Sequence, residues 1–427
     1  MKIIVQFNEA NFDIIRKYCE THDLKNFKKI LGSKSFSQTH SENKYENLEP
    51  WIQWYSFYTG KTFEEHQVFH LGDCLKNNHK NFLQEEAVAG KKMGVFGSMN
   101  MPYSDVYKIF IPDAWTESEC DQSLNSKLIK TTLSNIVNSN SRLRISLSDI
   151  LGLIILIGIP SRFEDIKIFF RTIFSFINRS RAELASYFDY YFMRYAIKRS
   201  KREKLEISQI FLNGFAHIQH HYLYSSELVT GKNPSWYVSS EKDLILESLK
   251  IYDKTFGLLF TLMNNNDEFF ILTGLTQKPY KKPEIYWRFR DHKKVLNNFF
   301  NFDFKVFPRM TRDFEVFTTR EMDIESVMDF LNKARIEFNN NETKAFDFVN
   351  QTSPKSIFAT FSYAGDSKKI ILKYKNIRCD LKNNLDFVAL KNAGHHEKGW
   401  LISNRSIENQ DIYIWDAYKY ISEIRLD

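Results

Sequence analysis

The sequence has 427 residues, of which 43% are hydrophobic and 26% charged, as expected for an ordinary soluble globular protein with one large domain or two modest ones. Its net charge of +7 is mild for this length and permits anionic partners without requiring them. The four cysteines (Cys19, Cys74, Cys120 and Cys379) have neither metal-ligand spacing nor a disulfide pattern, which favours free thiols in a reducing compartment.

The N-terminal segment predicts a buried strand followed by a helix. Lys2–Phe7 is an apolar run that ends in the polar pair Asn8-Glu9, and the following residues have helical spacing. The run is too short for a signal peptide, so we expect a cytoplasmic protein. A strand, a polar turn and a helix are typical of an α/β sheet with its chemistry at the carboxyl ends of the strands.

Further strands and helices alternate along the chain. This alternation predicts an α/β fold with a central, mainly parallel sheet between helices. Beyond residue 303 the predicted strands are shorter and more polar, and a helix over 321–338 interrupts them. We expect strands at 91–98, 107–113, 205–213 and 267–274, and helices at 122–137 and 241–263. We divide the chain into a first part of the core (1–144), a helical insertion (145–204), a second part of the core (205–300) and a mixed α/β region completing the core and the site (301–427).

The segment 145–204 differs from the rest of the chain. Its first apolar stretch is shorter than the ~20 residues that a membrane span needs, and its later part is aromatic, helical and edged with Arg and Lys. We favour a cap that packs on the sheet. The alternative is an amphipathic surface that meets membrane lipids or a lipid-linked substrate, which would make the protein membrane-peripheral. No nucleic-acid module is recognisable, so we expect no nucleic-acid partner.

An aromatic block lies early in the chain. Five aromatic residues fall between Trp51 and Tyr58, and the turn residues Thr59-Gly60 and then His66 follow. One interpretation is a core helix that runs into a capped loop. The other is the wall of an active site, in which the rings exclude water or stack on a sugar or a base. The residues of that wall would be Trp51, Trp54, Tyr55 and Tyr58.

Histidines and carboxylates offer a candidate metal site. His217 and His220 form a His-x-x-His pair directly after a predicted strand, and a helical turn would place both imidazoles on one face. Imidazoles combined with oxygen ligands suit zinc, manganese or iron. Core or surface histidines would give the same pattern, and both interpretations stay open. The candidate metal ligands are Asn8, Glu9, His217, His220 and His395.

Two blocks near the N-terminus resemble the alkaline phosphatase superfamily, in particular its type I phosphodiesterase and nucleotide pyrophosphatase branch. "IIVQFNEANFD" resembles the opening strand, with Asn8 at the position of a metal-binding Asp. "EPWIQWYSFYTGKTFEEHQV" resembles the block that carries the nucleophile, because Thr59-Gly60 and His66 fall in place. Gln53 falls where the family often has an Asn that contacts phosphate.

Two later blocks extend the resemblance. "AHIQH" resembles the family's Asp-x-x-x-His block, with His220 in place and Ala216 at the Asp position. "AGHHEKGWLI" resembles its Gly-x-His block, with matches at His395 and Gly399. The resemblance implies a central sheet between helices, with metal bound at the strand ends.

The same blocks also depart from the family pattern. Pro50 stands at the nucleophile position, and the Ser-Asp-His-Gly block is replaced by "TGLTQKP", which lacks its Asp and His. The resemblance therefore does not imply an intact two-metal site. It leaves room for one divalent transition metal, zinc or manganese. In that case Glu49, beside Pro50, is the candidate general base or nucleophile, with Gln53 and His66 as further catalytic residues.

Three functions remain open at this point. The first is a metal-assisted phosphodiesterase, hydrolase or group transferase that acts on a phosphorylated, nucleotide-linked, glycan or lipid-linked small molecule, with surface-polysaccharide metabolism as one setting. The second is a metal-free enzyme on the same fold, with Glu49 and the histidines as acid and base. The third is a catalytically degenerate binding or scaffold protein, because a retained fold does not carry function with it.

Overall fold

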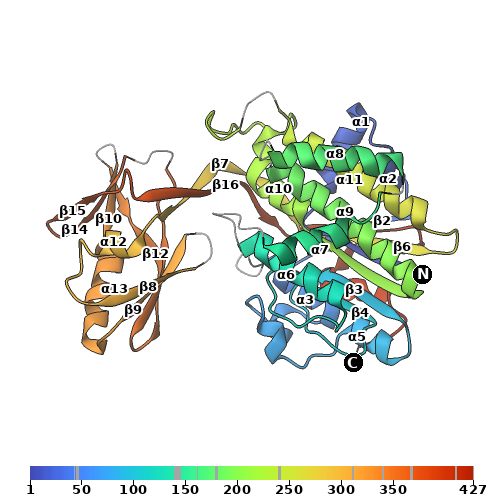
Figure 1. Cartoon of the computed structure of the whole chain (residues 1–427), viewed down its shortest axis with the longest axis horizontal. Helices are drawn as coiled ribbons and strands as arrows, with labels where there is room; N and C mark the ends of the chain where they lie inside the picture. Colours follow the sequence, from blue (N-terminus) through green and yellow to red (C-terminus); the bar gives the residue numbers. More distant parts are fainter. Residues whose placement is uncertain are drawn as a thin grey trace. The chain divides into compact units, whose positions relative to one another are not determined.

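The computed structural model divides the chain into two compact units. The larger unit consists of Met1–Tyr280 and Ala393–Asp427, and the smaller unit of Lys281–Asn392 (Figure 1). The side chains of 136–138 and 181–182 are not described. The structure describes residues 1–42, 44, 48–138, 146–160, 162–177, 181–238, 242–309, 312–338, 341–365, 369–408 and 411–426.

An eight-stranded sheet forms the centre of the larger unit, in the order β18-β2-β17-β6-β1-β5-β3-β4. The five strands from β6 to β4 are parallel to one another, and β17 is antiparallel to both of its neighbours. This confirms the predicted mainly parallel sheet. The strands are β1 (Lys2–Phe7), β2 (Ser35–His40), β3 (Met93–Ser98), β4 (Ile109–Pro112), β5 (Ile207–Leu212), β6 (Glu268–Leu272), β17 (Lys398–Ser403) and β18 (Asp411–Tyr413).

Helices cover both faces of this sheet. Successive residues of β1 point to opposite faces, so Val5 lies in one hydrophobic core and Ile4 in another. A parallel sheet that is buried on both faces has continuous apolar strands, as seen here. The helices of the Val5 side are α1 (Phe12–Thr21), α2 (Lys25–Leu31), α9 (Arg181–Glu203), α10 (Gly214–Tyr222) and α11 (Leu244–Leu262). Those of the Ile4 side are α3 (Pro50–Thr59), α5 (Phe82–Val88) and the 3-10 helix η5 (Ile414–Tyr420).

Between β4 and β5 the chain forms four consecutive helices: α6 (Leu124–Asn138), α7 (Leu147–Ile157), α8 (Phe163–Ile177) and α9. α9 packs on β5, while α7 and α8 pack on α9 and form an outer layer (Figure 1). Residue 145, where we expect the insertion to begin, lies outside the described residues. No helix among the described residues is long and apolar enough to cross a membrane.

The smaller unit contains two four-stranded sheets, and the paired strands β7 (Thr276–Phe289) and β16 (Leu385–His396) belong partly to each unit. The helix that we expect over 321–338 ends at Lys333, because the alternating residues Arg335–Phe338 pair with two strands as β10. The elements are α12 (His292–Leu296), α13 (Ile324–Lys333), β8 (Phe304–Pro308), β9 (Asp313–Thr318), β11 (Asn341–Lys344), β12 (Phe346–Ser353), β13 (Ser356–Phe361), β14 (Ile371–Tyr374) and β15 (Ile377–Asp380).

Candidate active site

The site begins where β1 ends. Glu9 follows the strand with a left-handed backbone, at φ 57°, which is uncommon for a residue other than glycine. The surrounding chain fixes this conformation, because the N–H of Glu9 donates to the carbonyl of Thr273 (2.9 Å) and its carbonyl accepts from Nε2 of Gln219 (2.8 Å). Backbone conformations of this kind cost about 1–3 kcal/mol and gather at functional sites.

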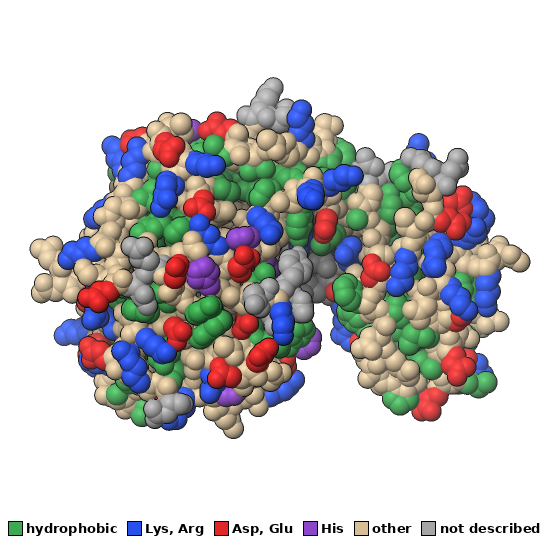
Figure 2. Space-filling model, turned by 180° about the vertical axis from the view of Figure 1, so that it is seen from behind, with side chains coloured by type: hydrophobic (Ala, Val, Ile, Leu, Met, Phe, Trp, Pro, Cys, Tyr) green, Lys and Arg blue, Asp and Glu red, His purple; other side chains and the backbone are tan. Residues whose placement is uncertain are grey.

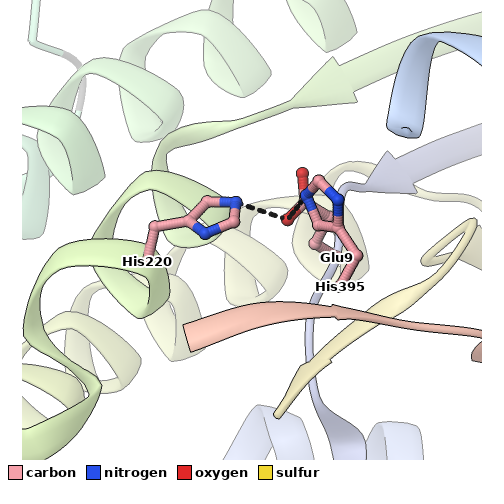
Figure 3. A group of neighbouring side chains, drawn as sticks. All are labelled: Glu9, His220 and His395. Atoms are coloured by element: carbon pink, nitrogen blue, oxygen red, sulfur yellow. Dashed lines mark ion pairs between the residues drawn. The ribbon is translucent and has the colours of Figure 1, made fainter. Parts of the chain in front are cut away.

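The carboxylate of Glu9 meets two imidazoles that come from distant parts of the chain. Nε2 of His220, on α10, lies 3.0 Å from Oε2 of Glu9, and Nε2 of His395, near the end of β16, lies 3.3 Å from the same oxygen (Figure 3). One potential ligand atom from each residue falls within 4.8 Å of the others. We call Glu9, His220 and His395 the Glu9 group. Figure 2 shows histidine side chains beside acidic ones on the surface of the larger unit.

Hydrogen bonds orient the members of the Glu9 group. Nδ1 of His220 lies 3.0 Å from the carbonyl of Ala393, an acceptor, so Nδ1 carries the proton and Nε2 faces Glu9. Nε2 of Gln277 donates to Oε2 of Glu9 (2.5 Å) and to the carbonyl of Ala216 (2.9 Å). Nδ2 of Asn8 donates to Oε1 of Glu9 (3.0 Å). Such outer hydrogen bonds are typical of sites whose ligands must be held in one orientation.

The surroundings keep Glu9 ionised. Burial raises the pKa of its carboxyl, but the charges of His395 and His220 and the hydrogen bonds from both imidazoles outweigh this effect and hold the pKa well below its usual value. Among the described residues, the buried Oε1 of Gln277 has no hydrogen-bond partner. This oxygen is therefore available to accept a hydrogen bond from a group that enters the site.

Glu49 lies on the other side of His395. It precedes the first residue of α3, and its Oε2 is 3.6 Å from Nδ1 of His395. The side chain of Glu49 is 35% exposed, against 4% for that of Glu9. His395 therefore stands between a buried carboxylate and a solvent-accessible one.

Two predicted metal ligands lie outside the Glu9 group. Asn8 is next to Glu9, but its Oδ1 accepts from the indole of Trp54 (2.8 Å), so the amide orients Glu9 and its oxygen is committed to the core. His217 is exposed, and its ring packs against that of His221, at 4.5 Å between centroids. The reason is the register of α10, which turns Phe215 and Ile218 inward and His217 outward.

The predicted catalytic residues His66 and Gln53 are not members of the Glu9 group, and each has hydrogen bonds of its own. The N–H of Val68 donates to Nδ1 of His66 (3.0 Å), so Nε2 carries the proton and donates to Oγ of Ser56 (3.0 Å). Burial, with the charge of His79, lowers the pKa of His66 to about 4. Gln53 is fully buried and accepts from the N–H of Glu42 (3.2 Å).

The aromatic block is mainly core. Trp54 and Tyr58 are fully buried against the Ile4 side of the sheet, and the Tyr58 hydroxyl donates to Gln6 (2.9 Å). Local geometry and packing explain why glycine stands at the two positions that match family blocks, Gly60 and Gly399. Gly60 ends α3 at φ 67°, and a Cβ on Gly399 would come within 2.6 Å of the Gly274 carbonyl. The indole of Trp54 connects the block to the Glu9 group through Asn8.

Sequence reasoning missed the supporting amides. Gln277 stands in "TGLTQKP", where the family that the sequence resembles has an Asp and a His, and the sequence analysis assigns it no role. In the structure it contacts Glu9 directly, and Gln219 fixes the Glu9 backbone. The available signal was an amide side chain just beyond the strand β6, beside Glu9 at the end of the adjacent strand β1.

Comparisons with known proteins give structural matches only. No protein-family model matches the chain, and no curated protein matches it. Among solved structures it is similar to phosphonoacetate hydrolase from Sinorhizobium meliloti in complex with phosphonoformate (12% identity, TM-score 0.44, covering 98% of this chain and 94% of that one). It is also similar to human ectonucleotide pyrophosphatase/phosphodiesterase 5 (10%, 0.43, 98% and 92%) and to the alkaline phosphatase PafA (10%, 0.45, 99% and 96%).

Proposed function

We propose that the protein is a hydrolase of phosphoester or phosphodiester bonds that works with one divalent transition metal held by the Glu9 group. The observation that carries this proposal is the convergence of Oε2 of Glu9 with Nε2 of His220 and Nε2 of His395. The three residues come from separate parts of the chain, so local sequence does not force them together: Glu9 follows β1, His220 lies on α10 and His395 on β16.

The residues fit a metal. Two imidazoles and one carboxylate, with a fourth position open, form the ligand set of catalytic zinc sites, and a related set holds iron. Nδ1 of His220 donates to a backbone carbonyl, as metal-binding histidines usually do. In the bound state both imidazoles would be neutral, and the metal would take their place as the positive charge beside the Glu9 carboxylate. A metal bound here would polarise a phosphoryl oxygen and make water a stronger nucleophile at neutral pH.

The remaining chemistry falls to the residues around the Glu9 group. Pro50 stands where the family has its nucleophile, so we propose that water is the attacking group. Glu49 is the nearest solvent-accessible carboxylate to His395, and we assign it the role of base that takes the proton from that water. Asn8 and Gln277 hold the Glu9 carboxylate at the orientation that the reaction needs.

The preference for a phosphorylated substrate rests on the ordered sequence blocks that end at His220 and His395 and on the position of the Glu9 group at the carboxyl edge of the sheet. In open α/β sheets this edge is where ligands bind. We propose a small phosphodiester, nucleotide-linked or glycan-linked, as the substrate.

The direct test is metal content with paired histidine variants. The purified protein is loaded separately with zinc, manganese and iron(II), and bound metal is measured after desalting, together with the shift in thermal midpoint. We expect about one equivalent of one of these metals and a stabilised fold. His220→Gln and His395→Gln should lose both effects, while their neighbours, changed as His221→Gln and His396→Gln, should keep them. Wild-type protein that binds none of the metals, or equal binding by all four variants, would contradict the proposal.

Hydrolysis is then measured with bis-p-nitrophenyl phosphate and p-nitrophenyl phosphate. Activity that requires the metal and is lost in His395→Gln supports the proposal.

A second candidate function is a metal-free reaction at the same site. It has support in the position of His395 between Glu9 and Glu49, since a carboxylate–imidazole–carboxylate chain can move protons without a metal. Activity that survives exhaustive chelation would favour that metal-free reaction.

A further inference from the structure

The helices α7 and α8 have the reverse of the usual arrangement of polar and apolar residues. A helix on the surface of a globular protein normally turns its apolar side inward. On α8, Asp165 is 1% exposed, whereas Phe163, Phe170 and Phe174 are 71%, 64% and 68% exposed. The helix therefore buries polar groups and presents aromatic rings to the outside.

Specific hydrogen bonds fix α8 in this orientation. Asp165 accepts from the Tyr190 hydroxyl (2.7 Å) and pairs with Arg194, at 3.3 Å from Oδ2 to Nη2. Further along the same side of α8, the hydroxyl of Thr172 is hydrogen-bonded to the hydroxyl of Tyr191 (3.0 Å). Ser175 donates to Glu183. Residues 165, 172 and 175 share one side of the helix, so the rings at 163, 170 and 174 must point away from α9.

α7 repeats this arrangement. Asp149 is buried, caps its own helix through Ser146 and accepts from Asn135 of α6 (2.9 Å). Gly152 lies so close to α6 that a Cβ there would come within 2.9 Å of the Leu128 carbonyl. The apolar side chains of Leu147, Ile150 and Ile154 are left 74%, 45% and 59% exposed.

One stretch of the chain is rich in exposed apolar side chains. Of the 25 exposed large hydrophobic side chains in the described part of the chain, 12 lie within residues 147–177. Exposed apolar side chains gathered on neighbouring elements mark an interaction site in a native protein. We call it the α7–α8 surface and define it by Leu147, Ile150, Ile154, Phe163, Phe170 and Phe174.

The charges around the α7–α8 surface are basic. Lys167 and Arg171 are exposed on α8, and the ammonium of Lys167 lies 4.6 Å from the centre of the Phe163 ring. Every acidic side chain of the two helices already has a partner within the protein: Asp149 has Asn135, Glu164 has Lys254, and Asp165 has Arg194. The charged side chains that α7 and α8 expose to solvent are therefore basic, because Asp149 and Asp165 are buried and Glu164 is only partly exposed.

We propose that the α7–α8 surface docks on a bilayer that contains anionic phospholipid. Aromatic and branched side chains enter the boundary between headgroups and acyl chains, and lysine and arginine pair with lipid phosphates, as in helices that lie in a membrane interface. With 11 and 15 residues, α7 and α8 are shorter than the ~20 residues of a span, so they lie along the surface. This inference is independent of the proposed reaction.

Vesicle flotation of the full chain tests the proposal. We expect the protein to float with phosphatidylcholine vesicles that contain phosphatidylserine, and much less with phosphatidylcholine alone. Phe170→Ser combined with Phe174→Ser should reduce the bound fraction at least about tenfold, because both rings are exposed and enter the lipid. Lys167→Glu combined with Arg171→Glu should remove the preference for phosphatidylserine.

The control replaces two aromatic residues that are equally exposed elsewhere, Phe348→Ser with Tyr413→Ser, and should float as the wild type does. Equal thermal midpoints show that each variant is folded. Failure of the wild type to float on either vesicle, or flotation of the Phe170/Phe174 variant at the wild-type level, would overturn the proposal. So would a wild-type dimer in lipid-free buffer that the same two substitutions convert to monomer, since a second copy would then be the occupant.

Discussion

The aromatic block around α3 and the Glu9 group carry similar signals in the sequence, but the structure uses them differently. Both contain a histidine that matches a family block, His66 in one and His395 in the other. His66 is closed in, with one nitrogen bonded to the Val68 N–H and the other to Ser56. His395 has its two nitrogens turned toward separate carboxylates, Glu9 and Glu49.

The difference shows which property separates a structural histidine from a candidate ligand. Both histidines match a histidine of a family block, and both are largely buried. The two histidines differ in their hydrogen-bond partners. The imidazole of His66 is bonded to neutral groups nearby in the chain, whereas that of His395 faces charged carboxylates from distant elements. The account therefore predicts that changes in the Glu9 group alter metal binding and activity, whereas changes in the aromatic block alter stability.

The largest effect is expected at Glu9. Glu9→Gln keeps the shape and the buried position but removes the negative ligand, so we expect loss of bound metal and a fall in kcat/KM of about 10³-fold or more. The exposed Glu397→Gln serves as the control, since Glu397 contacts only His396 among the ion pairs of the described residues. Metal content and steady-state kinetics check the result. Full metal binding by Glu9→Gln would remove Glu9 from the site.

The next effect concerns His66 and pH. Its pKa is lowered to about 4 in the folded state, and an unfolded histidine titrates near 6.5. Its contribution to stability is therefore complete above pH ~6.5 and is lost as the pH falls toward 4, by up to about 3 kcal/mol. Urea unfolding at pH 7, 6, 5 and 4 measures this. The difference between the wild type and His66→Gln should shrink as the pH falls, and a constant difference would contradict the assignment.

Glu49→Gln separates a base from a residue that merely orients His395. If Glu49 takes a proton in the reaction, kcat falls about 10²-fold or more, the metal content is unchanged and the acidic limb of the pH–rate profile disappears. If it only supports His395, metal affinity falls 10- to 100-fold, roughly, and the profile keeps its shape. Parallel titration of metal and measurement of the pH–rate profile decide between the two.

Gly399→Ala should affect stability alone. The added methyl group would lie 2.6 Å from the carbonyl of Gly274, and backbone atoms at that distance must move. We expect a loss of about 1–3 kcal/mol in the free energy of unfolding. Thermal unfolding gives the size of the effect. The bound metal per folded molecule should stay at the wild-type value, and a selective loss of metal would show that this glycine serves the site.

Much of the architecture could be predicted from the sequence. The runs at Lys2–Phe7 and around 205–213 and 267–274 are apolar and short, and each is a parallel strand of the sheet. The pattern failed at 335–338, where residues within an expected helix pair with two strands as β10. Periodicity describes a local preference, and tertiary pairing overrides it.

Part of the candidate site could also be predicted from the sequence. Glu9, His220 and His395 were among the predicted ligands, and the structure brings them together. Asn8 and His217 lie outside the Glu9 group because of the direction of their side chains, which depends on features that the sequence does not display. Asn8 is fixed by the Trp54 indole, and His217 by the inward register of Phe215 and Ile218. The left-handed backbone of Glu9 is another such feature.

Anomalous scattering from a crystal of the metal-loaded protein, recorded at the absorption edge of that metal, locates the ion itself. We predict one peak, at about 2.0–2.2 Å from a carboxylate oxygen of Glu9, Nε2 of His220 and Nε2 of His395. A loaded crystal without a peak at these three atoms, or with its peak at His66 or His217, would contradict this prediction.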